Sequence, residues 1–422
     1  MAGHTLANEL VPNLQGDYRI LLIDALDYSF WPIAALRAAV VPGWEEKIVL
    51  PLNTATVFPE GSIHQVIAPN KVVQLRPNSV ILENPFEGSK EVPFFRAVLA
   101  TGSIQPSPMR PSYDWTKEDY MQGLRKSQDE LKRAKSVIIV GGGTVGVEFA
   151  GEVRALYPEK EITIVHNKST VLSPDPLPIS YISDGNGSLN TKEKIPNSWT
   201  SPPTHPKLSR YLMSYLEAGR IHLVLEDRLV IPDPDARNAD SNDWDGSFGL
   251  QPTIKKLRTE KGQKIKGDYI FLAAGNKPNS SLVRNVDQDA VDKNGLIKVD
   301  NTLHVSASDG DNQDNSNYYA IGDVNDAPGT KTAYLATVQA KSAATNLINE
   351  IQGKRLAPYN PGTFSGLFVP FGPDLGAGSI TLPSLGTWTV GTTVVRKAKG
   401  QKLLLDRWGD AWMGKEKVTI IP

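Results

Sequence analysis

The feature that most constrains the fold is a glycine-spaced segment near the middle of the chain, Ser136 to Glu152 (SVIIVGGGTVGVEFAGE). Its β-branched run, Val137 to Val140, leads directly into Gly141-x-Gly143-x-x-Gly146 and then into a helical pattern. In such a strand–turn–helix unit the first glycine permits the tight turn, the second lets a diphosphate approach the backbone, and the third lets helix and strand pack closely. Phosphates then bind free N–H groups at the positive end of the helix. The segment predicts a dinucleotide site in a parallel α/β domain, with an ordinary strand-to-helix turn as the alternative.

The residue that would meet the ribose of this dinucleotide is unusual. An acidic residue is expected about 20 positions after the last glycine, where it binds the adenosine ribose. Here that position falls on His166, at the end of EITIVHNKS, with Lys168 close by. These side chains do not repel a 2′-phosphate as a carboxylate would, so NADH and NADPH both remain open.

Further short, nearly uncharged runs predict more buried parallel strands. They are Tyr18 to Asp24, Ala97 to Gly102, Ile162 to Val165, Tyr269 to Gly275 and Tyr318 to Asp323. Helical patterns at 146–156 and 334–351 alternate with them, which favours a doubly wound α/β architecture. Polar stretches at 167–206, 232–249 and 306–317 are predicted to be surface loops.

The chain changes texture after about residue 355 and predicts a small C-terminal domain. An uncharged stretch, Leu375 to Val395, is long enough to cross a bilayer, but its glycines, proline and threonines favour a β-rich surface or interface layer. The tryptophans of this region are expected in a core rather than at an interface; they are Trp388, Trp408 and Trp412.

Composition removes several classes of function. The 422 residues include no cysteine, which excludes disulfide frameworks, thiolate metal sites and redox-active cysteine pairs. Any redox chemistry must therefore come from a bound cofactor. Six scattered histidines predict no metal site, and a net charge of −1 predicts no nucleic-acid partner. The first ten residues lack the pattern of a signal peptide, so we expect an intracellular, cytoplasmic protein.

A second nucleotide site is indicated after residue 318. Tyr319 to Asp323 (YAIGD) has the pattern of a strand that ends in a carboxylate, and 331–346 (KTAYLATVQAKSAATN) that of a small-residue helix. Such a helix can approach a flat ligand closely, while Asp323 can accept from a sugar or ribitol hydroxyl. The alternative is an aspartate that caps a core helix.

Taken together, five segments resemble the two-dinucleotide-binding-domain flavoproteins, specifically the apoptosis-inducing-factor-like and ferroptosis-suppressor-like NAD(P)H oxidoreductases, which are related to class II NADH dehydrogenases. In chain order the segments are YRILLIDALDYSFWPIAALRAAV, AVLATGS, VIIVGGGTVGVEFAGE, YIFLAAGNKPN and YAIGDVNDAPGTKTAYLATVQA. The resemblance covers nearly the whole chain, and the joint occurrence of the segments is more specific than any single motif.

The resemblance implies FAD and either NADH or NADPH as cofactors, and it assigns roles to positions. Asp24 matches the carboxylate that holds the adenosine ribose of FAD, and Asp323 matches the flavin ribitol ligand. Glu148 and Lys331 match residues beside the nicotinamide and flavin rings and are the expected catalytic pair. From the residues alone, the alternative interpretation of Glu148 is an acid in the first helical turn, which the helix dipole favours. The alternative for Lys331 is a solvated lysine at the start of a helix. The other implied cofactor-binding positions are Gly3, Thr101, Gly102, Gly275, Gly322, Thr332 and Ala333.

The start of the chain departs from the family pattern. The family begins with its own strand and glycine motif about 20 residues ahead of the position of Asp24. Here residues 1–10 match the helix after that motif, with Gly3 at its third glycine, so we expect a gap beside 18–23 in the sheet. We favour a sequence that starts at an internal methionine of a longer chain; loss of flavin and an altered first domain that still holds FAD stay open.

These observations predict an α/β fold with two Rossmann-like doubly wound domains and a small C-terminal α+β domain. The FAD domain would be discontinuous and N-terminally truncated, with parts at 1–110 and 281–355; the NAD(P)H domain would span 111–280 and the interface domain 356–422. The expected function is an FAD-dependent NAD(P)H oxidoreductase that passes hydride through flavin to a quinone-like or other acceptor. The alternative is a flavin-free nucleotide-binding pseudoenzyme or sensor.

The expected partner is a small-molecule, quinone-like electron acceptor. The C-terminal segment is the candidate interface for a homodimer or a membrane surface, and both associations are left open. Within the cytoplasmic expectation, attachment to mitochondrial or other membrane surfaces is therefore open as well.

Overall fold

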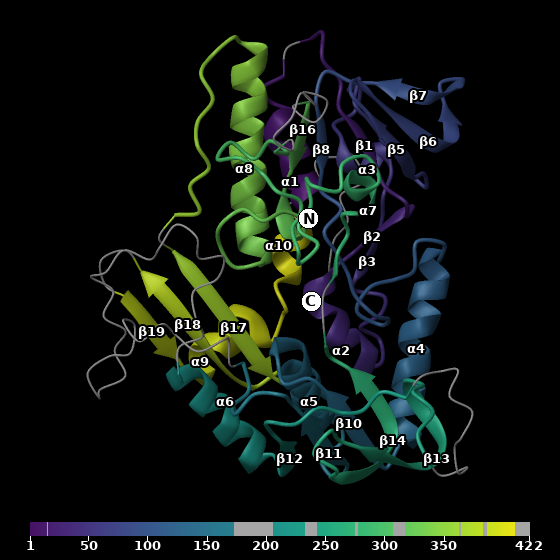
Figure 1. Cartoon of the computed structure of the whole chain (residues 1–422), viewed down its shortest axis with the longest axis vertical. Coiled ribbons are helices and arrows are strands. Elements are labelled where there is room, and N and C mark those ends of the chain that lie inside the picture. Colours follow the sequence, from purple (N-terminus) through teal and green to yellow (C-terminus); the bar gives the residue numbers. More distant parts are fainter. Residues whose placement is uncertain are drawn as a thin grey trace.

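The computed structural model of the chain describes residues 1–14, 16–172, 206–232, 243–274, 277–306, 317–362, 364–382 and 386–409. Figure 1 shows three groups of elements: one around the long helix α8 (Ala333–Ile351), one around the strands β10 (Ser136–Val140) and β14 (Lys264–Leu272), and a smaller sheet of the C-terminal region beside both. The predicted loops at 167–206, 232–249 and 306–317 lie largely outside the described residues.

The middle of the chain forms a five-stranded sheet in the order β12-β11-β10-β14-β13. Strand β10 pairs in parallel with β11 (Glu161–Val165) and with β14, and β11 pairs in parallel with β12 (Ile221–Val224). The remaining strand, β13 (Gly249–Arg258), runs antiparallel to β14. The four parallel strands follow the 3-2-1-4 order of a doubly wound domain, which confirms the prediction for this part.

Helices accompany the strands of this middle sheet. They are α4 (Lys117–Arg133), α5 (Thr144–Leu156) and α6 (Pro206–Ala218). Helix α4 begins with a capping box in which Thr116 and Asp119 bond each other's backbone N–H groups. Ile138 and Ile139 of β10 are buried on opposite faces of the sheet in different apolar clusters, as a strand covered on both sides requires.

The N-terminal part contains two separate parallel strand pairs. Strand β1 (Leu21–Ile23) pairs with β4 (Gln65–Ile67), and β8 (Ala97–Leu99) pairs with β16 (Tyr318–Ala320), which returns from far along the chain. Side chains of all four strands share one apolar cluster, yet among the described residues β1 has a strand partner on one edge only. Strand β1 is thus an edge strand among the described residues, which is compatible with the gap predicted beside 18–23.

Helices and short strands complete this part. Helix α1 (Ala2–Leu10) packs against α8, and the two lie side by side in Figure 1. Strands β9 (Ser103–Ile104) and β15 (Lys277–Pro278) pair where the chain passes between the N-terminal and middle parts. The sequence did not predict the antiparallel meander β5 (Val72–Arg76), β6 (Ser79–Phe86) and β7 (Ser89–Pro93). The other elements are β2 (Tyr28–Phe30), β3 (Val49–Pro51), η1 (Pro32–Ala34), α2 (Ala35–Val40), α3 (Thr54–Val57), α7 (Ser281–Arg284) and η4 (Gly322–Val324).

The C-terminal region is a small α+β unit, as predicted. Strands β17 (Ser365–Phe371), β18 (Leu375–Leu382) and β19 (Gly386–Val390) form an antiparallel sheet, followed by α9 (Thr392–Val395), the π-helix η5 (Arg396–Gly400) and α10 (Leu405–Gly409). The uncharged stretch from Leu375 is thus two strands and a short helix. Among the helices that the structure describes, none is long and apolar enough to cross a membrane.

The tryptophans of this region divide between core and surface. Trp408 is 3% exposed and stacks on Trp31 of the N-terminal part at 5.4 Å between ring centroids. Trp388 is 60% exposed, so its predicted core position is wrong. It lies on β19, which pairs only with β18 and leaves its other edge uncovered among the described residues. Trp412 lies outside the described residues, and the domain boundaries at 110, 280 and 355 stay predictions.

Candidate functional site

The glycine turn between β10 and α5 needs glycine at two positions for steric reasons. Gly141 has a φ of 117°, and a Cβ there would lie 2.8 Å from the carbonyl oxygen of Ala273. A Cβ on Gly146 would lie 2.0 Å from the carbonyl oxygen of Gly141, because the helix starts directly against the turn. Gly143 differs, since a Cβ there would meet no atom of the described residues within 4 Å. The turn is closed toward the protein and open at Gly143.

The open side of the turn faces the start of a helix. Gly143 is the N-cap of α5, no side chain caps its free N–H groups, and the first turn carries no acidic residue. Free N–H groups and the positive end of the helix dipole together bind phosphate well. Gly141, Gly143 and Gly146 therefore fit the diphosphate of a nicotinamide dinucleotide.

His166 lies against this turn, as its position in the sequence predicts. Its Nδ1 accepts from the N–H of Gly142 at 3.2 Å, and a Cβ on Gly142 would come within 2.8 Å of the imidazole ring. Burial, reinforced by Lys168, lowers the pKa of His166. With Nδ1 as acceptor the neutral ring carries its proton on Nε2, which is buried, and a hydrogen bond to the backbone of Thr170 acts to raise the pKa of the ring.

The two carboxylates predicted for a second dinucleotide both lie close enough to the amino group of Met1, just before α1, to be influenced by its charge. Asp24 follows β1, and its carboxylate accepts from the N–H of Leu26 at 3.0 Å. Burial raises the pKa of Asp24 and of Asp323, and the same two cations, the guanidinium of Arg110 and the amino group of Met1, act to lower both. Two half-buried hydroxyl acceptors that share the influence of one guanidinium would fit the two sugar-type ends and the diphosphate of FAD.

Glycines and backbone hydrogen bonds hold the loop after β8, the start of α1 and the turn at Gly322 close to their neighbours. Gly322 has a φ of 82°, and its N–H donates to Gln339 Oε1 of α8 at 2.7 Å. A Cβ built on Gly3 would be 3.5 Å from Cβ of Ala100, so α1 packs directly on the loop after β8. In that loop the Thr101 hydroxyl donates to the carbonyl of Asn279 at 2.7 Å, and the carbonyl of Gly102 accepts from the N–H of the same residue at 2.9 Å.

Lys331 lies in a buried polar network and not in solvent. Its ammonium group donates to the backbone carbonyl and, at 3.1 Å, to the side-chain oxygen of Asn325, whose amide donates to Gln339 at 3.0 Å. Burial lowers the pKa of Lys331, while Asp323 and Asp326 act to raise it. Thr332 caps α8 by accepting from the N–H of Leu335, and Ala333 begins the helix. This network fixes Lys331 relative to Asp323.

Glu148 is buried in α5, one turn beyond the glycine turn. Its carboxylate accepts from Lys399 of η5 at 2.8 Å, and the two side chains are 12% and 18% exposed. Burial raises the pKa of Glu148, and Lys399 acts in the opposite direction. The expected partner of Glu148 in catalysis, Lys331, makes its own bonds elsewhere, to Asn325 and Ala327.

The structure thus groups the predicted residues into a nicotinamide-dinucleotide set at the start of α5 and a flavin set around α1, η4 and the start of α8. Gly275 lies outside the described residues. No three potential metal-ligating side chains cluster within the described ranges. The individual ligand assignments stay predictions.

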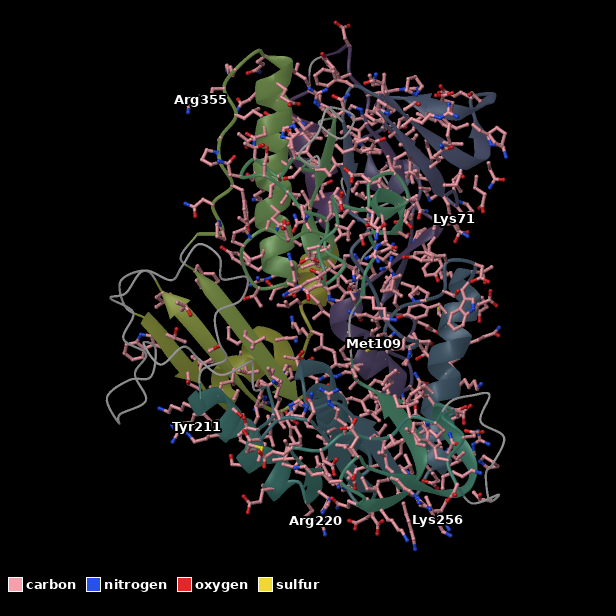
Figure 2. The ribbon with its side chains drawn as sticks, in the orientation of Figure 1. Lys71, Met109, Tyr211, Arg220, Lys256 and Arg355 are labelled. Carbon is pink, nitrogen blue, oxygen red and sulfur yellow. The ribbon has the colours of Figure 1, made fainter. Side chains whose placement is uncertain are left out.

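Sequence reasoning missed two basic residues. Arg110 follows the predicted domain crossing, but nothing in its local pattern marks it; Figure 2 labels its neighbour Met109 near the middle of the molecule. Arg110 donates to the carbonyls of Thr101 and Ser103, and its Nε is buried without a partner among the described residues. Lys399 lies 251 residues from Glu148, so only the tertiary structure brings the two together.

The chain is similar to known proteins over most of its length. The model of the family described as pyridine nucleotide-disulphide oxidoreductase matches residues 1–184 and 198–342. Ferroptosis suppressor protein 1 of Homo sapiens is 26% identical over 91% of this chain and 87% of its own length, and apoptosis-inducing factor homolog B of Dictyostelium discoideum is 24% identical over 95% and 92%. The solved sulfide:quinone oxidoreductase of Aquifex aeolicus shares the fold, with a TM-score of 0.64 and 14% identity over 96% of this chain and 88% of that one.

Proposed function

Because the chain belongs to the pyridine nucleotide-disulphide oxidoreductase family, and is therefore an FAD-dependent NAD(P)H oxidoreductase, we propose that its electrons go to a quinone-like small molecule. The observation that carries the redox role is the pair of dinucleotide sites, one at the open turn of Gly143 and one around Asp24, Arg110 and Asp323. When bound, FAD supplies the hydride-accepting ring and returns electrons to the acceptor.

Separate groups of residues would bind NAD(P)H and FAD and orient their rings. The N–H groups at the start of α5 would hold the diphosphate of NAD(P)H, and Nε2–H of His166 would donate to its ribose or 2′-phosphate. Arg110 would neutralise the FAD diphosphate, with Asp24 and Asp323 accepting from hydroxyls. Glu148 would orient the nicotinamide, and Lys331, held by Asn325, would lie beside the flavin ring.

Two features support a quinone-like acceptor. The sequence has no cysteine, so no dithiol can relay electrons to a disulfide substrate. Two exposed aromatic rings, Tyr334 at the start of α8 and Phe364, also meet edge to face at 5.2 Å, and Tyr334 lies close in the chain to Lys331. Flat apolar rings at a surface suit a flat apolar acceptor. The Aquifex aeolicus enzyme with this fold carries quinone in its name.

Exposed apolar side chains of the C-terminal unit support a further proposal, attachment of a cytoplasmic protein to a membrane surface. Leu375, Trp388 and Val394 are all exposed there. Sedimentation with phosphatidylcholine vesicles tests it: Trp388→Ser should lose most of the bound fraction. Equal binding by parent and variant would contradict it, and a concentration-dependent dimer lost in the variant would assign the face to a homodimer instead.

The redox proposal is tested by spectroscopy. The purified protein, supplied with FAD, should show a flavin spectrum that NADH or NADPH bleaches without oxygen and that a soluble quinone restores. A bleached flavin that oxygen reoxidises but quinone does not would overturn the acceptor assignment. Protein that binds NAD(P)H but never flavin would overturn the redox assignment and favour a sensor.

A further inference from the structure

The guanidinium of Arg110 binds the protein through one nitrogen and leaves another without a partner among the described residues. Its Nη1 donates to the carbonyl of Thr101 at 3.4 Å and to that of Ser103, while its Nε is buried and unpaired. The Nε–H and Nη2–H bonds of a guanidinium point in parallel and match two oxygens of one phosphate. A buried charged donor without an acceptor is costly, so the Nε edge is suited to an anionic ligand.

An aromatic ring covers one face of this guanidinium. Cζ of Arg110 lies 5.0 Å from the centroid of the Tyr113 ring, which is a cation–π contact. Burial raises the pKa of Tyr113, and the charge of Arg110 acts to lower it. The two carbonyls hold Nη1 and the ring restricts the tilt of the guanidinium plane. Together these contacts set the direction of the Nε edge.

Tyr113 is itself held from a distant part of the chain. The side-chain amide of Asn279 donates to the Tyr113 hydroxyl at 2.7 Å. The backbone N–H of Asn279 donates to the carbonyl of Gly102 at 2.9 Å, and its carbonyl accepts from the Thr101 hydroxyl at 2.7 Å. Asn279 follows β15, which pairs with β9 where the chain passes between the N-terminal and middle parts. One residue of the second passage therefore bonds the first passage at both its loop and its tyrosine.

The charges near Arg110 belong to the flavin set. Arg110 acts to lower the pKa of Asp24 and of Asp323, which burial raises, and Asp24 also acts on Tyr113. In FAD the diphosphate joins the adenosine ribose to the ribitol. A cation that acts on the proposed acceptors of both sugar-type ends is therefore well placed for the diphosphate between them.

We propose that Tyr113 is a positioning residue for Arg110: its ring, fixed by Asn279, directs the Nε edge of the guanidinium toward the diphosphate of FAD. The proposal rests on the function proposed above. It extends the flavin set to both passages of the chain between the N-terminal and middle parts.

The first test measures FAD affinity by titrating flavin-free protein and following the quenching of flavin fluorescence. Tyr113→Leu should weaken FAD binding by roughly threefold to thirtyfold, because the ring no longer orients the guanidinium. Tyr113→Phe keeps the ring and should recover most of the affinity. Tyr211→Leu is the matched control and should match the parent, since it removes a cation–π contact with Lys207, 5.9 Å long, on the surface helix α6 (Figure 2).

The second test separates positioning from general damage to the structure. Arg110→Met should weaken FAD binding by roughly tenfold to a hundredfold, as loss of hydrogen bonds from a charged group does. In that background Tyr113→Leu should have no further effect, because the tyrosine acts through the missing guanidinium. Calorimetric titration with NADH should give the parental affinity in every variant, since the turn at α5 keeps its residues.

Each result decides something separately. Parental FAD affinity in Tyr113→Leu would overturn the proposal, as would a further loss when Tyr113→Leu is added to Arg110→Met, or an equal loss of NADH affinity. If Tyr113→Leu does not fold, Tyr113→Met replaces it under the same criteria. A parent protein that binds NADH but never FAD would overturn the function proposed above, and this proposal with it.

Discussion

At the scale of single residues, Gly143 is the glycine of the turn whose missing side chain affects ligand binding more than folding. Its two companions in the turn are fixed by contacts inside the protein, whereas a Cβ at Gly143 would meet none of the described residues within 4 Å. A substitution there changes what the turn can bind without disturbing how it folds. This makes Gly143 more informative to mutate than Gly141 or Gly146.

Replacing Gly143 by aspartate should abolish NAD(P)H binding. The side chain would occupy the approach to the helix start and place a negative charge against a diphosphate, a like-charge contact that costs several kcal/mol, or roughly a hundredfold or more in affinity. Calorimetric titration with NADH measures the loss, and Gly143→Ala, which adds a methyl group without charge, is the control. Parental affinity in the aspartate variant would refute the assignment of the turn.

Asp323 is the matching residue of the flavin set. Asp323→Ala removes a half-buried acceptor and should lower the flavin content of protein purified in the presence of FAD, while Asp323→Asn, which keeps one oxygen acceptor, should retain more. The absorbance ratio of flavin to protein reports the outcome. Equal ratios in parent, alanine and asparagine proteins would remove Asp323 from the site.

At the scale of elements, α5 connects the site to the rest of the molecule. Its start forms the diphosphate site, and its buried acids pair with Arg37 and Lys399 from other elements. The glycine spacing predicted the start of this helix because turn, cap and packing are local. The two ion pairs were not predictable, since their partners lie 115 and 251 residues away.

Breaking the buried pair between Arg37 and Glu152 should destabilise the whole molecule. The two side chains are 3% and 5% exposed, and removing one partner of such a pair costs about 3–5 kcal/mol because the other charge stays buried. Urea unfolding of Arg37→Met measures this. Arg396→Met, which breaks the surface pair with Asp374, should cost under about 1 kcal/mol. Equal midpoints for the two variants would contradict the joint role of Arg37.

At the scale of the whole molecule, the sequence predicted the middle domain better than the first. Three continuous apolar runs and one glycine motif predicted β10, β11 and β14, because parallel strands buried on both faces have a distinctive pattern, whereas β12 was not predicted. The first domain is assembled from distant segments, with β8 and β16 paired across more than 200 residues. The alternating, half-exposed meander β5–β7 and the exposure of Trp388 depend on which surfaces other elements cover, which local patterns do not encode.

We expect this chain to hold NAD(P)H and FAD together so that NAD(P)H reduces the flavin. An oxygen-free titration of the FAD-loaded protein with NADH, followed by flavin absorbance, tests it most directly. We expect complete bleaching at one NADH per flavin in the parent protein and none in Gly143→Asp. If the parent protein binds NADH but its flavin stays oxidised, this expectation is contradicted.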